Sequence, residues 1–383
     1  LDFSHHLRVD RVDDTQTSII FRVFMDIRNY KIGILGAGKS GLALARLVKQ
    51  LGAVASLSDK NLALKQRDEL TQNQSLSLFQ VETGNHSKEF ILNNQLIVLS
   101  PGVSIYSEPV RFAKENNIPV MGEIEFAYQF CSKPIIAVTG SNGKTTVSTQ
   151  NHRIITRAGY KSLLCGNIGR PFSECVMSSH EYDYVVLEIS SFQLESLLTF
   201  NEKRRFAASL LPRFKGFKPW IGLLLNLCQN HLDRHKDLQE YFDAKKNLFL
   251  NQGEEDYAVL NFENEQFQQL AKEISSRPKF FNSLDALQTF PGSNANQLVV
   301  RRVAQIMNIA DEVCDEVFRD FKGIEHRMEF VRSINGVDFL NDSKSTTAES
   351  TRWALTNIDK PVIMICGGRD KNIDFSVIAP LVA

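Results

Sequence analysis

The sequence predicts an α/β protein of three domains, and three observations support this. An apolar stretch followed by a glycine-rich turn and a helix-like segment occurs at Lys31–Leu35 and again at Ile135–Thr139. A third strand-and-helix pattern begins near Phe321. The chain has 383 residues, which is too long for a single core. We therefore expect a Rossmann-like domain, a central parallel-sheet domain with a phosphate-binding loop, and a third Rossmann-like domain.

Composition bears on partners and on compartment. The 44 basic and 44 acidic side chains cancel, so the charge balance indicates neither a nucleic-acid nor a membrane partner. The chain has no apolar run as long as a membrane span, and its start lacks the layout of a signal peptide. The six cysteines are scattered, which favours reduced thiols over a disulfide or zinc framework. We expect a cytoplasmic monomer.

Residues 1–29 are unlike the start of a domain. Leu1 is not an initiator residue, the segment is charged, and only Ser18–Phe24 has a strand-like composition. Met25 is a candidate native start. We therefore treat this segment as a leader or upstream read-through and assign it no role.

The first domain, residues 30–131, has the element order of a dinucleotide site. The turn Gly36-Ala-Gly38-Lys-Ser-Gly41 follows its first strand, and its second strand ends at Asp59. A Rossmann fold holds a diphosphate and a ribose at these positions. From these residues alone, NAD and another diphosphate such as a nucleotide-sugar remain open. A later strand ends at Ser100-Pro-Gly102, where such sheets place ligands, although Pro-Gly also makes an ordinary turn.

The central domain, residues 132–320, opens with a phosphate-binding loop, Thr139-Gly-Ser-Asn-Gly-Lys-Thr145. Its backbone N–H groups and the following helix N-terminus would converge on an anion, with Lys144 as a point charge and Thr145 as a Mg²⁺ ligand. The glycines are closer together than in the common motif, so an ordinary strand-turn-helix corner is the alternative. Glu188 ends the apolar strand Tyr184–Leu187, which is where a Mg²⁺ ligand is expected.

Later parts of this domain carry further polar candidates. The basic segment 202–220 is predicted to be a solvated loop rather than an anion site. His231 and His235 could indicate zinc, but no third soft ligand lies nearby in sequence, which disfavours it. Lys245 falls on or beside the apolar stripe of a predicted helix. Its stem either reaches out along that stripe to water, or its amine is used chemically.

The third domain, residues 321–383, is predicted to contain a hairpin that turns at Asn335-Gly336. Val362–Cys366 then leads into Gly367-Gly-Arg-Asp-Lys371. The segment is short for an α/β domain with this strand-helix-strand pattern. We therefore expect its last strands to lie beyond Ala383.

Taken together, six motifs resemble the Mur ligase family. In chain order they are Thr139-Gly-Ser-Asn-Gly-Lys-Thr145, Gly166-Asn-Ile-Gly169, Leu187-Glu-Ile-Ser-Ser-Phe-Gln-Leu-Glu195, His231-Leu-Asp-Arg234, His326-Arg327 and Asn341-Asp-Ser-Lys344. The resemblance covers residues 30–383, and the third motif is most similar to members that add D-glutamate to UDP-N-acetylmuramoyl-L-alanine. It implies a cytoplasmic ATP-dependent ligase of peptidoglycan synthesis that works through an acyl phosphate.

The resemblance also implies site residues. It favours a UDP-sugar over NAD in the first domain, held by Gly38, Lys39, Ser40, Asp59, Ser100, Gly102 and Asn167. ATP would be bound by Gly140, Ser141, Asn142, Gly143, Lys144, Thr145, Thr146, Asn296, Arg327, Asp342 and Lys344. One Mg²⁺ would be held by Thr145 and Glu188, and a second by His231 and a carbamylated Lys245. These metal residues, with Lys144, would be catalytic, and Lys371 would approach the amino acid.

The chain departs from the family pattern at several places. Asn230 replaces an aspartate before His231, and Gly292-Ser-Asn-Ala-Asn296 is shorter than the adenine motif and lacks its histidine. The basic segment 202–220 resembles an insertion. Within the same chemistry, another Mur ligase or a folylpolyglutamate synthase is an alternative, but the latter would not need the first domain. Because of these departures, the alternative from a different class is a relative or fragment that binds nucleotide and UDP-sugar without catalysis.

Overall fold

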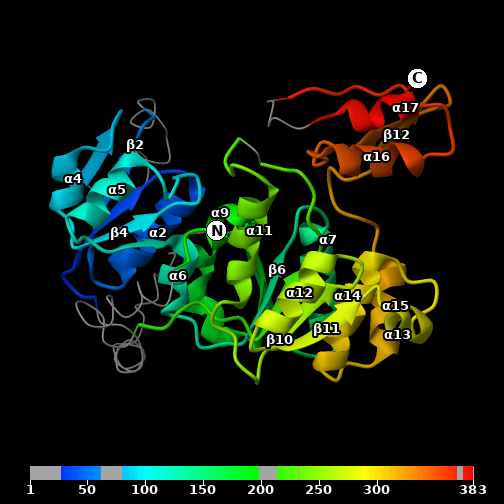
Figure 1. The fold of residues 1–383 in the computed structure, drawn as a ribbon, viewed down its shortest axis with the longest axis horizontal. Helices are drawn as coiled ribbons and strands as arrows, with labels where there is room; N and C mark the ends of the chain where they lie inside the picture. The colour runs from blue at the N-terminus through cyan, green and yellow to red at the C-terminus, as the bar shows by residue number, and fades with distance from the viewer. Residues whose placement is uncertain (1–26, 62–79, 198–213, 232, 369–373, 383) are drawn as a thin grey trace, which may run out of the picture.

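The computed structural model describes residues 27–61, 80–197, 214–231, 233–368 and 374–382, and Figure 1 shows them as three units. Most of the predicted leader, much of the basic segment 202–220 and the candidate Lys371 lie outside the described residues. The predicted α/β class is confirmed, because two parallel sheets form the first and second units. The domain boundaries stay a prediction.

The first unit is a doubly wound sheet with the order β3-β2-β1-β4-β5, all parallel. Chain order reverses between β1 and β4, and open α/β sheets bind ligands at such a switch point. The loops after β1 and β4 therefore meet at the place where the sequence predicted a UDP-sugar. The strands are β1 (Lys31–Leu35), β2 (Val54–Asp59), β3 (Gln80–Thr83), β4 (Leu96–Leu99) and β5 (Val120–Gly122), and the helices are α2 (Lys39–Gln50), α4 (Lys88–Leu92), α5 (Glu108–Glu115) and α6 (Glu123–Tyr128).

The central unit is a six-stranded parallel sheet with the order β11-β10-β9-β6-β8-β7. The phosphate-loop strand β6 lies between β8 and β9, so the loops after all three strands share one edge. The strands are β6 (Ile135–Thr139), β7 (Ser162–Gly166), β8 (Tyr184–Glu188), β9 (Ile221–Leu224), β10 (Tyr257–Asn261) and β11 (Arg277–Phe281).

Helices cover both faces of the central sheet, because its strands are apolar on both sides. Helices α7, α14 and α15 share a cluster with one face, while the other face is continuous with the first unit. The helices are α7 (Lys144–Arg157), α8 (Phe172–Cys175), η3 (Val176–Glu181), α9 (Ser191–Leu194), α11 (Leu238–Lys246), η4 (Asn247–Phe249), α12 (Glu265–Glu273), α13 (Leu284–Thr289), α14 (Ala295–Ile306) and α15 (Asp311–Asp320).

The third unit is smaller and holds an antiparallel hairpin of β12 (Glu329–Ile334) and β13 (Val337–Asn341). Its turn lies at Asn335 and Gly336, both with positive φ, as the sequence predicted. The hairpin is followed by α16 (Ala348–Thr356), η5 (Ser376–Ile378) and α17 (Ala379–Val382). Residues 361–368 carry no regular secondary structure.

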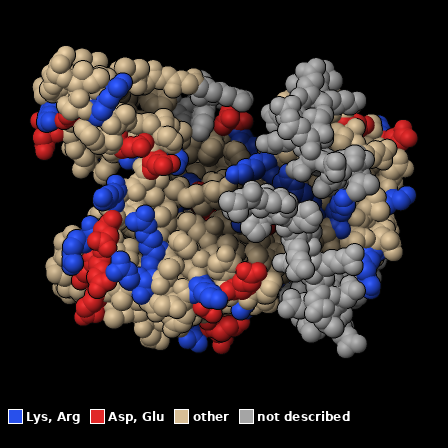
Figure 2. Space-filling model, turned by 180° about the vertical axis from the view of Figure 1, so that it is seen from behind, with Lys and Arg blue, Asp and Glu red and all other residues tan. Residues whose placement is uncertain are grey.

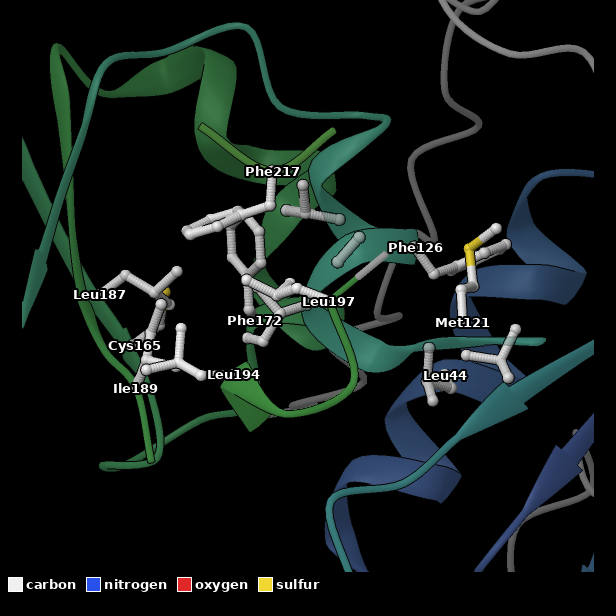
Figure 3. Close-up of a cluster of buried hydrophobic side chains, with 14 of the residues drawn as sticks. Leu44, Met121, Phe126, Cys165, Phe172, Leu187, Ile189, Leu194, Leu197 and Phe217 are labelled. Atoms are coloured by element: carbon white, nitrogen blue, oxygen red, sulfur yellow. The ribbon is translucent and has the colours of Figure 1, made fainter. Parts of the chain in front are cut away.

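One apolar core runs from the first unit into the second. Leu44 and Phe126 from the first unit belong to the same cluster as Phe172, Leu197 and Phe217 from the second (Figure 3). Burying a side chain of this size contributes roughly 1.5–3 kcal/mol. The first two sheets are therefore joined by packing as well as by the chain.

On the face in view, acidic and basic side chains are mixed over the central unit, while Lys and Arg side chains gather near the middle of the face (Figure 2). A hollow lies between the third unit and part of the central unit (Figure 2). Within the described residues, every helix is too short or too polar to cross a bilayer.

Candidate functional site

The phosphate loop joins β6 to α7 and is anchored by the segment that follows β9. The N–H of Ser141 donates to the carbonyl of Asn226 at 3.1 Å, and the N–H of Asn142 donates to the Asn226 side chain at 2.8 Å. Gly143 has a φ of 81°, and a Cβ there would lie 2.9 Å from the Asn296 Oδ1. Glycine therefore allows both the turn and the approach of α14, which brings the candidate Asn296 to the loop.

Two amines converge on the carbonyl of Gly140. Lys144 Nζ donates to it at 2.8 Å and also to the Ser141 carbonyl at 3.0 Å. Lys245 Nζ, which α11 places in the interior, donates to the same Gly140 oxygen at 3.0 Å. It also lies 4.4 Å above the Tyr241 ring. Lys144 thus places a cation at the loop, as an anionic phosphate requires, and Lys245 lies directly beside it.

Lys245 is the most unusual of these groups, because its side chain is buried and its Nζ lies near the neutral Thr139 hydroxyl and Gly140 carbonyl. Burial, reinforced by the charge of Lys144, holds the pKa of Lys245 well below its usual value. A lowered pKa favours the neutral amine, which is the form that can act as a nucleophile. The sequence had left open whether this lysine packs or reacts.

Glu188 ends β8 next to the phosphate-loop strand, where it pairs in register with Val138. Its side chain is buried, and Oε1 accepts a hydrogen bond from Asn167 Nδ2 at 2.8 Å. The second oxygen, Oε2, is buried and has no hydrogen-bond partner among the residues that the structure describes. Such an oxygen is costly unless something binds it, and a carboxylate oxygen is a ligand that Mg²⁺ prefers. The residues present therefore fit a divalent cation.

Asn167 was predicted to contact the UDP-sugar, and the structure places it against Glu188. Its backbone N–H also donates to the Glu188 carbonyl at 2.8 Å. Gly166 precedes it with a φ of 106°, and a Cβ there would lie 2.3 Å from the Glu188 carbonyl oxygen. The Gly166-Asn-Ile-Gly169 motif thus holds the end of β8.

His231 lies on the segment after β9, with a φ of 57°. Its ring packs edge-on against Phe192 at 4.7 Å between centroids, and its N–H donates to the Asn230 side chain at 3.0 Å. His235 is buried, and its Nε2 lies 3.1 Å from Ser191 Oγ. Burial lowers the pKa of His235 to about 4, so it is neutral at pH 7. The described residues include no group of three His, Cys, Asp or Glu side chains gathered for a metal.

The turn after β1 has the form of a diphosphate loop. Gly36 has a φ of 88°, and a Cβ on Gly41 would lie 1.8 Å from the Gly36 carbonyl oxygen. Asp59, at the end of β2, accepts the N–H of Ala37 at 2.7 Å. Lys39 extends from the start of α2 and donates to the carbonyl of Gly169 in the central unit. The candidates of this turn and those near Glu188 are thus brought together.

The loop after β4 carries the remaining first-unit candidates. Ser100 is buried, and its N–H donates to the Leu35 carbonyl at 3.0 Å. Gly102 is exposed, and its carbonyl accepts a hydrogen bond from Arg234 at 3.2 Å. This contact crosses from the central unit to the first.

The third unit reaches the phosphate loop through the start of α16. Thr347 Oγ1 donates to Asn142 Oδ1 at 3.3 Å. Of the candidates before it, Asp342 accepts the Met328 N–H at 3.0 Å, and Lys344 donates its N–H to the His326 carbonyl at 3.0 Å. These contacts tie the Asn341–Lys344 motif to His326-Arg327. The nucleotide roles of Arg327, Asp342 and Lys344 stay predictions.

Sequence reasoning missed several residues of this site. Asn226 and Cys228 anchor the phosphate loop, since the Cys228 N–H donates to Ser141 Oγ at 3.0 Å. Their position just after a strand adjacent to β6 is the signal that could have found them. Arg234 was quoted only as part of a motif, and no sequence signal indicates that it spans two units.

Comparison with known protein families matches the central and first units to two family models. The family model described as the Mur ligase middle domain matches residues 138–297. The model described as the Mur ligase MurD-like N-terminal domain matches residues 30–122.

Curated relatives match over most of the chain. A UDP-N-acetylmuramoylalanine–D-glutamate ligase of Thermoanaerobacter sp. is 35% identical over 380 residues, covering 92% of this chain and 80% of the relative. The enzyme of the same name from Caldicellulosiruptor bescii is 36% identical over 390 residues, covering 94% of this chain and 81% of the relative.

A solved structure supports the fold. The UDP-N-acetylmuramate:L-alanyl-gamma-D-glutamyl-meso-diaminopimelate ligase from Neisseria meningitides superposes with a TM-score of 0.51 at 16% identity. The match covers 77% of this chain and 99% of that one.

Proposed function

The chain belongs to the Mur ligase family, and from that membership we infer that it is the ligase that adds D-glutamate to UDP-N-acetylmuramoyl-L-alanine in peptidoglycan precursor synthesis. It uses ATP and Mg²⁺, as the family does. The observation that carries the proposal is the identity of 35–36% with D-glutamate ligases over more than nine tenths of this chain. We further propose that it works in the cytoplasm as a monomer, without a membrane or nucleic-acid partner.

We propose that the first unit holds the UDP-sugar. The N-terminal family match over residues 30–122 favours this ligand over NAD for the turn after β1. Gly38, Lys39 and Ser40 would lie at the diphosphate and Asp59 near the uracil. Ser100, Gly102 and Asn167 would complete the site, and the sugar's carboxylate would extend toward the phosphate loop.

The chemistry requires two anions to meet. A carboxylate oxygen of the substrate attacks the γ-phosphorus, and ADP leaves. The amine of D-glutamate then attacks the carbonyl carbon of the acyl phosphate, and inorganic phosphate leaves from the tetrahedral intermediate. Lys144, already seated at the loop, would offset phosphate charge in the first step. Lys371 is proposed to approach the amino acid.

The remaining ATP contacts are proposed for Gly140–Thr146, Asn296, Arg327, Asp342 and Lys344. One Mg²⁺ would be held by the Thr145 hydroxyl and the unpartnered Glu188 Oε2. A second would be held by His231 and a carbamylated Lys245. When bound, the ions would neutralise phosphate oxygens and polarise the γ-phosphoryl group.

The carbamylation of Lys245 has support in its surroundings. A neutral amine can attack CO₂, form an N–C bond and lose a proton, which leaves an anionic carbamate. The lowered pKa of Lys245 favours the neutral amine. The product would replace a cation with an oxygen ligand at a place where Lys144 already supplies positive charge.

The proposed function is tested by ATP- and Mg²⁺-dependent incorporation of labelled D-glutamate into UDP-N-acetylmuramoyl-L-alanine, with phosphate release followed in parallel. Product formation with equimolar phosphate is expected. Tight binding of both nucleotides without product would instead support the non-catalytic alternative, and tight NAD binding without UDP-sugar binding would overturn the assignment of the first unit.

Lys245 is tested against its neighbour. Lys245→Ala should lower the rate by about 10²–10³-fold, and acetate or bicarbonate should partly restore it. Lys246→Ala removes a half-exposed lysine that pairs with Asp243 and should change little. Loss of activity without rescue by either anion would show that Lys245 only packs.

A further inference from the structure

Arg234 joins the first and central units through one side chain. Its Nη1 donates to the carbonyl of Gly102 at 3.2 Å, and its Nη2 donates to that of Val103 at 2.9 Å. Its Nε donates to Glu195 Oε1 at 3.1 Å, and Nη2 also pairs with that oxygen. The guanidinium lies 4.9 Å above the Phe192 ring. The fork thus binds a carboxylate in one unit and two carbonyl groups in the other.

Each end of this bridge belongs to a part of the proposed site. The two carbonyl groups are on the loop after β4, and Gly36 of the diphosphate turn packs against that loop. If Gly36 carried a Cβ, that atom would lie 3.0 Å from Ser100 Cβ and 3.0 Å from Val103 Cγ2. On the central-unit side, the backbone N–H of Arg234 donates to the backbone carbonyl of His231 at 2.9 Å. One residue therefore connects the UDP-sugar wall to the candidate metal segment.

The ion pair of the bridge is largely buried. The side chains of Arg234 and Glu195 are 15% and 6% exposed. Burial raises the pKa of Glu195, and Arg234 opposes that rise. Beside the pair lies a cavity of about 310 Å³, lined in part by Leu99, Glu195 and His235. Because side chains leave this cavity unfilled, the ion pair helps to set the spacing of the two units on this side.

We propose that Arg234 is a positioning residue that sets the distance between the UDP-sugar site and the phosphate loop. This inference rests on the proposed function. A lysine in its place offers a single point charge and cannot hold a carboxylate and two carbonyl groups in a fixed plane. A misplacement of about 1 Å between reacting groups can cost about 10²-fold in rate.

The test compares Arg234→Lys with Arg302→Lys. The Arg302 side chain is 12% exposed, close to the value for Arg234. Its guanidinium also binds a carboxylate and a backbone carbonyl, but both partners, Asp285 and Phe280, lie in the central unit. In Arg234→Lys, kcat/KM for the UDP-sugar should fall about 10- to 100-fold while the KM for ATP changes less than about twofold. Arg302→Lys should leave both values close to wild type.

A second readout separates the positioning role from the proposed activity. Amide hydrogen exchange at residues 100–104 should speed up in Arg234→Lys and stay unchanged in Arg302→Lys, whether or not the protein makes product. Equal losses for ATP and UDP-sugar, or unchanged exchange in that loop, would overturn the proposal. A wild-type protein that makes no product, with the exchange result as expected, would reject the ligase assignment while supporting the bridge.

Discussion

The first and third units both contact the central domain, but through different kinds of surface. Toward the first unit, Leu44, Met121 and Phe126 continue into Phe172 and Leu197 as one apolar cluster (Figure 3). Toward the third unit, the contacts of the loop segment are polar: Thr347 Oγ1 donates to Asn142 Oδ1 at 3.3 Å, and Glu349 lies beside Cys228. Among the described residues, none after Asp320 belongs to the main apolar clusters.

The two kinds of contact hold the first and third units to the central domain with different strength. A shared apolar core fixes two sheets as a single body, whereas a polar contact on a loop costs little to break. The proposed UDP-sugar wall is therefore held relative to the phosphate loop by this core, and Arg234 adds a polar link between the two units. The third unit contacts the proposed nucleotide loop at Asn142, and we expect this weak contact to have little influence on nucleotide affinity.

The largest effect should come from the shared core. Phe172 is 0% exposed, and Phe172→Ala should lower the free energy of unfolding by about 3–5 kcal/mol. Phe330 in the third unit is 61% exposed, and Phe330→Ala should change it by less than about 0.5 kcal/mol. Urea unfolding followed by fluorescence measures both. Equal losses would mean that the third unit is packed as firmly as the first.

The sequence was sufficient for the parts of this picture that depend on local pattern. Glycine-rich turns at Gly36–Gly41 and Gly140–Thr145 predicted two nucleotide loops, and the strand before Glu188 predicted a carboxylate beside the second. The structure places all three at strand ends of parallel sheets. The hairpin turn at Asn335-Gly336 was likewise predictable, because its residue types favour positive φ.

The sequence could not predict contacts between segments that lie far apart in the chain. Phe172 and Leu44 are both apolar, but nothing local indicates that they share one core across two units. The same holds for Arg234, whose partners Gly102 and Glu195 lie far away in the chain. For Lys245, helical periodicity located the residue beside an apolar stripe, while its desolvation depends on the whole fold.

The close approach of the first two units can be tested at Gly122. A Cβ there would lie 2.0 Å from Ser196 Oγ, although its φ of −84° suits any residue. Gly122→Ala should therefore cost about 1–3 kcal/mol, and adding Ser196→Gly should recover most of that loss. Gly367→Ala in the third unit meets nothing within 4 Å and serves as the control. Thermal unfolding is measured for the wild type, Gly122→Ala, the double variant and Gly367→Ala. If Ser196→Gly does not restore the stability lost in Gly122→Ala, the two units are not in close contact at this point.

A smaller, pH-dependent effect is expected at Glu123, which lies in the same interface and accepts the Ser173 N–H at 2.8 Å. Burial raises the pKa of Glu123 above 4.5, although hydrogen bonds from Ser173 and Gln193 oppose the rise. Above pH 4.5 the unfolded chain therefore binds fewer protons than the folded one, so this group's contribution to stability falls as pH rises toward its folded pKa. Below pH 4.5 the contribution is fully present.

Glu123→Gln removes this titration. As pH rises from 4.5 to neutral, the free energy of unfolding of the variant should therefore increase relative to that of the wild type. Urea unfolding at a series of pH values measures the difference. Glu273→Gln changes an exposed carboxyl and should run parallel to wild type. Parallel curves for Glu123→Gln as well would mean that the carboxyl is hydrated in the folded protein.

The smallest effect should be found where the third unit meets the phosphate loop. Thr347 caps α16, since its Oγ1 accepts the Ser350 N–H at 3.1 Å, and the same hydroxyl donates to Asn142. Thr347→Ala should cost about 1 kcal/mol from the lost cap and should shift the KM for ATP by no more than about twofold. Thr347→Ser keeps the hydroxyl and should match wild type in both measurements. A 10- to 100-fold change in the KM for ATP in Thr347→Ala would contradict this, because a contact that is cheap to break cannot control nucleotide affinity so strongly. It would show that the third unit is held as firmly as the first.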